Sequence, residues 1–165
     1  MPIGRSIKWL FIGGGIVRLN RQANEAFNDG RNEEALKLLL TAERRYVFYE
    51  VTYHNLGNVF QALHRDDDAE KAFRRAIQLK PKFVEAMNDL ATLLVKKGDR
   101  EEAEKVLRKA IEFEPDYPYA HINLGRILID KGSFSEAETE FKRALDSKDL
   151  DDKTKKDLED EMALD

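Results

Sequence analysis

The chain has 165 residues, no cysteine and a formal net charge of −4. The lack of cysteine excludes disulfides, zinc–thiolate sites and cysteine nucleophiles, and the acidic balance argues against a general nucleic-acid binder, whose surface would be strongly basic. Charged residues make up 36% of the sequence, above the roughly 25% of ordinary domains, which is typical of a thin fold with much of its surface in water.

The first segment, residues 1–15, carries no repeat pattern. Residues 7–17 are almost all apolar, but this run is about half the length of about 20 residues that a membrane span needs. Three roles are open: a cap in which Trp9 and Phe11 cover the apolar end of the next segment, a surface that docks on a partner or a membrane, or a signal or anchor. The triple glycine at positions 13–15 lacks the spacing of a nucleotide-binding loop, and it predicts a flexible hinge before the first helix.

One pattern then recurs with a period of 34 residues, in the copies 16–49, 50–83, 84–117 and 118–151. In its clearest copy it reads Tyr53-x-x-Leu56-Gly57-x-x-Phe60, then Ala69-x-x-x-Phe73, Ala76 and Pro81. The large apolar residues recur at helical spacing, and the small residues mark where two helices approach closely. The proline ends the second helix. Each copy is therefore predicted to be an antiparallel helix pair that stacks on its neighbour to bury its apolar face.

This order of large and small residues resembles the tetratricopeptide repeat. The resemblance covers four tandem copies over residues 16–151, and it implies an all-α fold, a right-handed α-α superhelix of antiparallel helix pairs. Residues 152–165 are highly charged, with Leu158, Met162 and Leu164 toward one side. They predict a C-terminal capping helix or, alternatively, a disordered acidic tail.

The turn inside each copy has its own signature. Gly30, Gly98 and Gly132 follow the first helices, and Gly30 is expected to adopt the left-handed conformation of a helix C-cap. The second copy has His64 there, followed closely by three aspartates at positions 66–68. These lack the alternating ligands, central glycine and distal glutamate of a calcium loop. We interpret them as the first turn of a helix, where carboxylates complement the helix dipole.

No group of residues in the sequence predicts catalysis. The spacings of a nucleophile elbow, a zinc protease and a phosphate-binding loop are all missing. His54, His64 and His121 occupy different slots of the repeat. His121 takes the large apolar slot that Tyr53 and Met87 fill in other copies, which predicts a packed histidine rather than a ligand. We therefore predict a protein that is not an enzyme and that uses no cofactor and no metal.

The resemblance also implies a concave groove lined by the first helices of the repeats, which binds a partner peptide or helix. An asparagine amide offers a donor and an acceptor that match a peptide bond, so a row of them can hold an extended chain through its backbone. These side chains are expected to be exposed. The predicted groove residues are Asn20, Arg21, Asn24, His54, Asn55, Asn58, Gln61, Asn88, Asp89, Thr92, Tyr119, Asn123 and Arg126.

Some members of the family bind the carboxylate ends of heat-shock chaperones through a clamp of cationic and amide side chains. Asn20, Glu85 and Asp89 stand where that clamp needs cations, and the two acids would repel a carboxylate. Starting the clamp one copy later places His54, Tyr119 and Asn123 at the cationic positions. Chaperone carboxylate peptides are therefore not expected as ligands.

The sequence predicts a non-catalytic protein–protein interaction scaffold that binds a protein or peptide and no nucleic acid. Two alternatives stay open: a membrane-docked or membrane-anchored assembly factor that uses residues 7–17, and a scaffold that forms homo-oligomers by end-to-end stacking of repeats. An interaction scaffold, oligomeric or not, is expected in the cytoplasm. A membrane-docked assembly factor would be membrane-associated.

Overall fold

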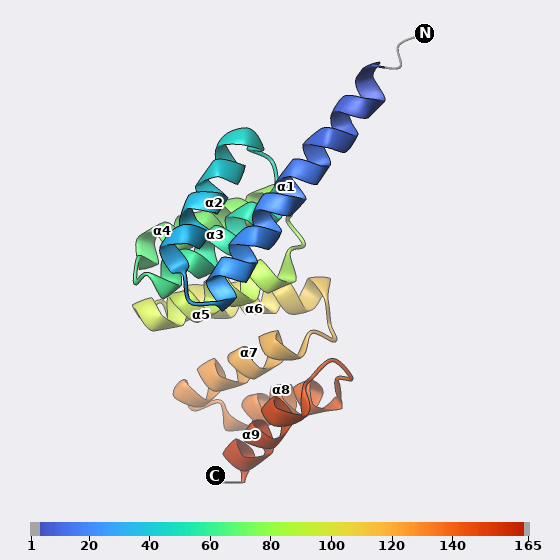
Figure 1. Ribbon diagram of the computed structural model, residues 1–165. Helices are drawn as coiled ribbons and strands as arrows, with labels where there is room; N and C mark the ends of the chain where they lie inside the picture. The colour runs from blue at the N-terminus through green and yellow to red at the C-terminus, as the bar shows by residue number, and fades with distance from the viewer. Residues whose placement is uncertain (1–3, 164–165) are drawn as a thin grey trace. The chain divides into compact units, whose positions relative to one another are not determined.

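Four helices form the first part of the chain, and each connects to the next through a short turn. They are α1 (Gly4–Asn28), α2 (Asn32–Arg45), α3 (Glu50–Ala62) and α4 (Asp66–Leu79). α1 packs against α2 and α3, and α3 packs against α4 (Figure 1). The computed structural model describes the backbone of residues 4–163 and the side chains of residues 14–163. It divides into two compact units, Met1–Pro81 and Lys82–Asp165, and each is described by itself.

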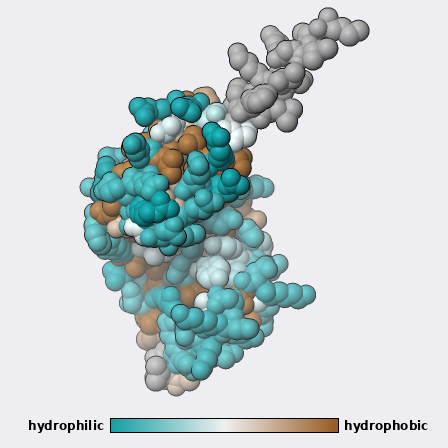
Figure 2. All heavy atoms as spheres, in the orientation of Figure 1, coloured by the Kyte–Doolittle hydropathy of each residue, from teal (hydrophilic) through white to brown (hydrophobic). Residues whose placement is uncertain are grey.

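The second unit repeats the same arrangement and adds one helix. It contains α5 (Val84–Lys97), α6 (Arg100–Phe113), α7 (Pro118–Asp130), α8 (Phe134–Asp146) and α9 (Asp152–Met162). α5 pairs with α6, α7 pairs with α8, and α9 packs against α8. Over the described residues every element is a helix, so the all-α class and the pairing of adjacent helices are confirmed. Hydrophilic residues cover most of the visible face, as the high charge content requires (Figure 2).

The expected hinge at the triple glycine is wrong, because α1 continues without a break from Gly4 to Asn28. Glycine still disfavours this helix by about 1 kcal/mol per residue relative to alanine, so packing has to compensate where it can. Gly15, the last of the three glycines, lies so close to the Tyr46 hydroxyl that a Cβ on Gly15 would collide with it. Within the described residues, no helix is both long enough and apolar enough to cross a membrane.

Two glycines allow the closest helix contacts inside the pairs. Gly57 of α3 lies against the Phe73 ring of α4, and Gly125 of α7 lies against the Phe141 ring of α8. A Cβ on either glycine would overlap the ring, and both rings are almost fully buried. The sequence interpretation of these slots as points of close helix approach therefore holds in both units.

The turn that ends each first helix needs a left-handed residue. Gly30, Gly98 and Gly132 have φ values of 75°, 90° and 76°, and His64 adopts the same conformation with φ 57° in the second copy. A non-glycine side chain is uncommon there. Directly after it, α4 begins at Asp66 and holds the three aspartates in its first turn, where they complement the helix dipole as interpreted.

The C-terminal helix has a well-formed start and a buried anchor. The Asp151 carboxylate caps α9 by accepting a 2.9 Å hydrogen bond from the Thr154 backbone N–H, and Leu158 is 1% exposed. An Arg126–Glu161 ion pair of 2.9 Å joins α7 to α9. The alternative of a disordered tail is therefore wrong over residues 152–162, while the expected role of Leu164 lies outside the described residues.

Candidate functional site

A buried amide pair joins the first helices of the first unit. Asn20 of α1 is 5% exposed, and its Nδ2 donates to the Ile16 carbonyl at 3.0 Å and to Thr52 Oγ1 at 2.9 Å. Its Oδ1 accepts a 3.1 Å hydrogen bond from Asn55 Nδ2 of α3. The Asn20 side chain thus uses its donor and its acceptor inside the protein, and Thr52 supplies a fully buried partner.

The second unit contains the same pair between α5 and α7. Asn123 Nδ2 donates to Asn88 Oδ1 at 2.8 Å, and it also reaches Thr92 Oγ1 at 3.3 Å. The two asparagines are 35 residues apart, the same separation as in the first pair. That separation is one residue longer than the 34-residue repeat. The asparagine of the later helix therefore bonds to the residue that stands one position before its equivalent in the preceding repeat.

These pairs correct part of the predicted groove. Asn20, Asn55 and Asn88 were expected to be exposed, but they are buried. Polar groups withdrawn from water need hydrogen-bond partners, and the asparagines of neighbouring first helices supply them to one another. They therefore join adjacent first helices by hydrogen bonds, which the repeat pattern alone did not reveal.

We expect Asn20→Ala to destabilise the protein by about 1–2 kcal/mol, because it leaves the Asn55 amide and the Thr52 hydroxyl of the buried cluster without a partner. Asn24→Ala removes the same kind of side chain from an exposed position of the same helix and is expected to stay within about 0.5 kcal/mol of the parent. Urea unfolding followed by far-UV circular dichroism measures both. Equal stability of the two variants would contradict a stabilising role of the buried Asn20 hydrogen bonds.

The remaining predicted residues of the first unit lie at or near the surface. Arg21 and Asn24 of α1 are exposed, and the Arg21 guanidinium lies 3.7 Å from the Glu25 carboxylate. His54, Asn58 and Gln61 of α3 are half-buried. The first unit therefore has amide and cationic side chains at accessible positions of α1 and α3, in addition to the buried pair.

In the second unit the predicted residues already have internal partners. The Tyr119 hydroxyl donates to the Asp151 carboxylate at 3.2 Å, and Arg126 pairs with Glu161. Thr92 is exposed and Asp89 is half-buried. The C-terminal helix and its cap thus provide two of the carboxylates that border the first helices of this unit.

Sequence reasoning did not select Tyr117, which lies in the turn before α7. Its ring centroid is 5.6 Å from that of Tyr119. Burial raises the pKa of the Tyr117 hydroxyl, and the negative charges of Asp89 and Glu85 raise the pKa further. Tyrosine next to proline in a predicted turn was a visible signal, but only the fold places this ring among carboxylates.

His121 is packed, as its apolar slot indicated. It is 1% exposed, its Nδ1 lies 2.6 Å from a Glu140 carboxylate oxygen, and its Nε2 donates to the Pro115 carbonyl at 2.7 Å. Glu140 also accepts a 3.0 Å hydrogen bond from Arg143. His121 therefore connects α7 to α8 through Glu140 and to the turn before α7 through Pro115. No group of three or more histidine, aspartate or glutamate side chains suited to a metal occurs in the part of the chain that the structure describes.

Comparison with known proteins points to one family. Tetratricopeptide repeat models match residues 51–83 and residues 88–152. A search of curated proteins found no match. The crystal structure of MamA is similar with a TM-score of 0.72 and 21% identity, over 91% of this chain and 81% of MamA.

Two further solved structures carry peptide binding in their descriptions. The first TPR of Spaghetti (RPAP3) bound to an HSP90 peptide has a TM-score of 0.68 and 20% identity, over 72% of this chain and 94% of that chain. YrrB, a TPR protein with an unusual peptide-binding site, has a TM-score of 0.67 and 22% identity, over 79% and 67%. At these identities the similarity establishes the fold alone. Together the two family matches cover more than half of the sequence, and the chain belongs to the tetratricopeptide repeat family.

Proposed function

We propose that the protein is a non-catalytic interaction scaffold that binds a peptide or helix of a partner protein on the exposed face of its first helices. The observation that carries the proposal is the polar row of Asn24 and Asn58 beside the buried pair in the first unit. Because Asn20 and Asn55 fix the helices, the neighbouring amides are presented on a rigid surface. A preorganised row of this kind loses little conformational entropy on binding. The peptide-binding neighbours support the same class of function.

The ligand chemistry is suggested by the second unit. The Tyr117 and Tyr119 rings lie next to each other, and the negative charges of Asp89 and Glu85 contribute to the raised pKa of Tyr117. Aromatic faces and carboxylates together favour a lysine or arginine side chain. We therefore infer that the partner segment carries a basic residue where it meets this unit. A chaperone peptide that ends in a carboxylate lacks this match.

The proposal is tested with a displayed library of random peptides, selected on the full-length chain. We expect the selected peptides to lose at least about tenfold in affinity when Asn24 and Asn58 are both changed to alanine. A separate Asp89→Asn variant is expected to weaken peptides with lysine or arginine more than peptides without them. Fluorescence anisotropy of labelled peptides gives the dissociation constants.

Gln78→Ala is the matched control, because it removes an exposed amide from α4, a second helix. It should leave peptide affinity unchanged. Selected peptides that bind the double asparagine variant as tightly as the parent would contradict the proposed surface. Circular dichroism of each variant verifies that the helices remain intact.

A further inference from the structure

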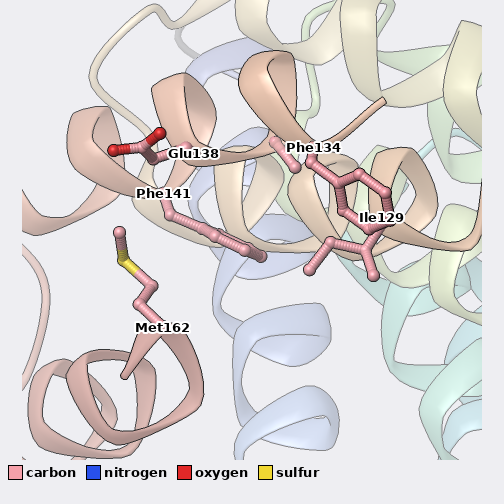
Figure 3. Close-up of a pocket in the computed structure, with 6 residues that line it drawn as sticks. Ile129, Phe134, Glu138, Phe141 and Met162 are labelled. Atoms are coloured by element: carbon pink, nitrogen blue, oxygen red, sulfur yellow. The ribbon is translucent and has the colours of Figure 1, made fainter. Parts of the chain in front are cut away.

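An apolar pocket opens between α7, α8 and α9 in the second unit. Its volume is about 520 Å³, and it is lined by Ile129, Phe134, Ala137, Glu138, Phe141 and Met162. Figure 3 shows Met162 reaching from α9 toward Phe141, with Phe134 beside Ile129 at the other end. The Phe134 side chain is 63% exposed. Apolar surface of this kind in water favours a partner that covers it.

The repeat pattern continues into α9. Leu158 and Met162 of α9 stand 34 residues after Leu124 and Leu128 of α7, so α9 has the pattern of a first helix. The 35-residue separation of Arg126 and Glu161 repeats that of the asparagine pairs. Over the described residues, however, α9 has no second helix paired with it.

The first unit has a pocket at the same slot. Phe60 of α3 occupies the slot of Met162, and it lines a cavity together with Ala72 of its paired helix α4. In the second unit the pocket is lined mainly by apolar side chains, Met162 among them, and it therefore suits an apolar occupant.

The charges around the pocket define the occupant further. Glu138 belongs to the lining and forms an ion pair with Lys142 at 2.5 Å. The last turn of α9 has no basic residue, so the negative end of its dipole adds to its carboxylates. The second half of this helix carries Asp157, Glu159, Asp160 and Glu161. An apolar helix with basic residues complements this surface.

The chain itself contains such a helix. The N-terminal turns, which we define as residues 4–13 of α1, combine Arg5 and Lys8 with a run of apolar residues that includes Trp9. α1 has 25 residues against 14 in α2, and its N-terminal turns extend beyond α2 (Figure 1). The glycines at positions 13–15, where the segment ends, oppose the helix by about 3 kcal/mol in total, and a Cβ on Gly14 would meet no atom within 4 Å. A packing partner would stabilise this stretch.

We propose that the N-terminal turns of one copy bind in the α8–α9 pocket of a second copy. The contact joins two different surfaces, so it is heterologous, and its repetition gives open chains of molecules. It uses neither the polar row of Asn24 and Asn58 nor the tyrosines and carboxylates assigned to peptide binding. The proposal therefore stands independently of the proposed function.

The only tryptophan of the protein, Trp9, reports this contact directly. With rising protein concentration, we expect the Trp9 emission to shift to shorter wavelength while sedimentation velocity shows larger species over the same range. Phe134→Glu places a charge in the apolar pocket, and it is expected to weaken association at least about tenfold. Phe48→Glu is the matched control, because Phe48 is 79% exposed in the other unit.

A mixing experiment then tests the direction of the contact. The Phe134→Glu chain keeps intact N-terminal turns, and a Trp9→Glu chain keeps an intact pocket. Their mixture should stop at one-to-one complexes, and the Trp9 emission of the first chain should shift when the second is added. Association that survives Phe134→Glu unchanged would overturn the proposal. So would a Trp9 emission that is independent of protein concentration, or one that shifts only when phosphatidylglycerol vesicles are added.

Discussion

Gly57→Ala is expected to destabilise the protein by about 1–3 kcal/mol, although alanine is the better helix former. Helix propensity alone would stabilise the variant by about 1 kcal/mol. The added Cβ, however, would overlap the Phe73 ring, which is fully buried and would have to displace its neighbours to move. Overpacking of this kind costs about 1–3 kcal/mol, so the steric term is expected to exceed the gain. Gly57→Leu adds a larger side chain at the same contact and should damage the fold more.

The other repeats show how the collision is relieved. Where the second helix carries phenylalanine, the first helix carries glycine, as in Gly57 with Phe73 and Gly125 with Phe141. Where the second helix carries leucine, the first carries alanine. The corresponding pairs are Ala23 with Leu39 and Ala91 with Leu107. The two slots therefore compensate each other in volume.

This compensation predicts strong coupling in a double-mutant cycle. Phe73→Leu alone leaves a cavity and lowers the free energy of unfolding. Combined with Gly57→Ala it recreates the pair found in the first and third copies, and the double variant should be more stable than the sum of the single effects by at least about 1 kcal/mol. Urea unfolding of the four proteins measures the cycle. Additive effects would contradict direct packing between the two slots.

His121→Leu is expected to destabilise the protein by about 3–5 kcal/mol. The Pro115 carbonyl can only accept, so Nε2 must carry a proton, while Nδ1 faces the Glu140 carboxylate. Leucine fills the space, but the buried Glu140 carboxylate then loses its contact with His121 and keeps the one with Arg143. Removing one partner of a buried carboxylate typically costs this much, because the charge stays buried with fewer groups to stabilise it.

The double variant His121→Leu with Glu140→Leu should recover most of the lost stability, since two apolar side chains of similar size can replace a buried polar pair. Glu138→Ala is the matched control on the same helix, because its ion pair with Lys142 lies at the surface and should contribute little. Far-UV circular dichroism in urea distinguishes these outcomes. A His121→Leu chain as stable as the control would show that the pair has no structural role.

Much of this protein is determined by its sequence alone. The 34-residue period fixes which face of each helix is apolar, and that is enough to predict the helix pairs, since burying that face is the main driving force. The lack of a side chain at Gly57 predicted a close contact between two helices. The aspartates likewise predicted the start of α4, and the spacing of apolar residues predicted the buried side of α9. Both are local properties of a helix, namely the preference for carboxylates at its N-terminus and amphipathic spacing.

The tertiary structure decided what those local patterns leave open. An asparagine at the edge of a helix can face water or the adjacent helix. Which of the two it faces depends on the distance between the helices. For this reason Asn20, Asn55 and Asn88 could be placed on the first helices but not recognised as buried. The triple glycine reads locally as a hinge, whereas α1 continues through it. The pocket at Phe134 is likewise a property of how α7, α8 and α9 meet, because an open position exists only relative to the helices around it.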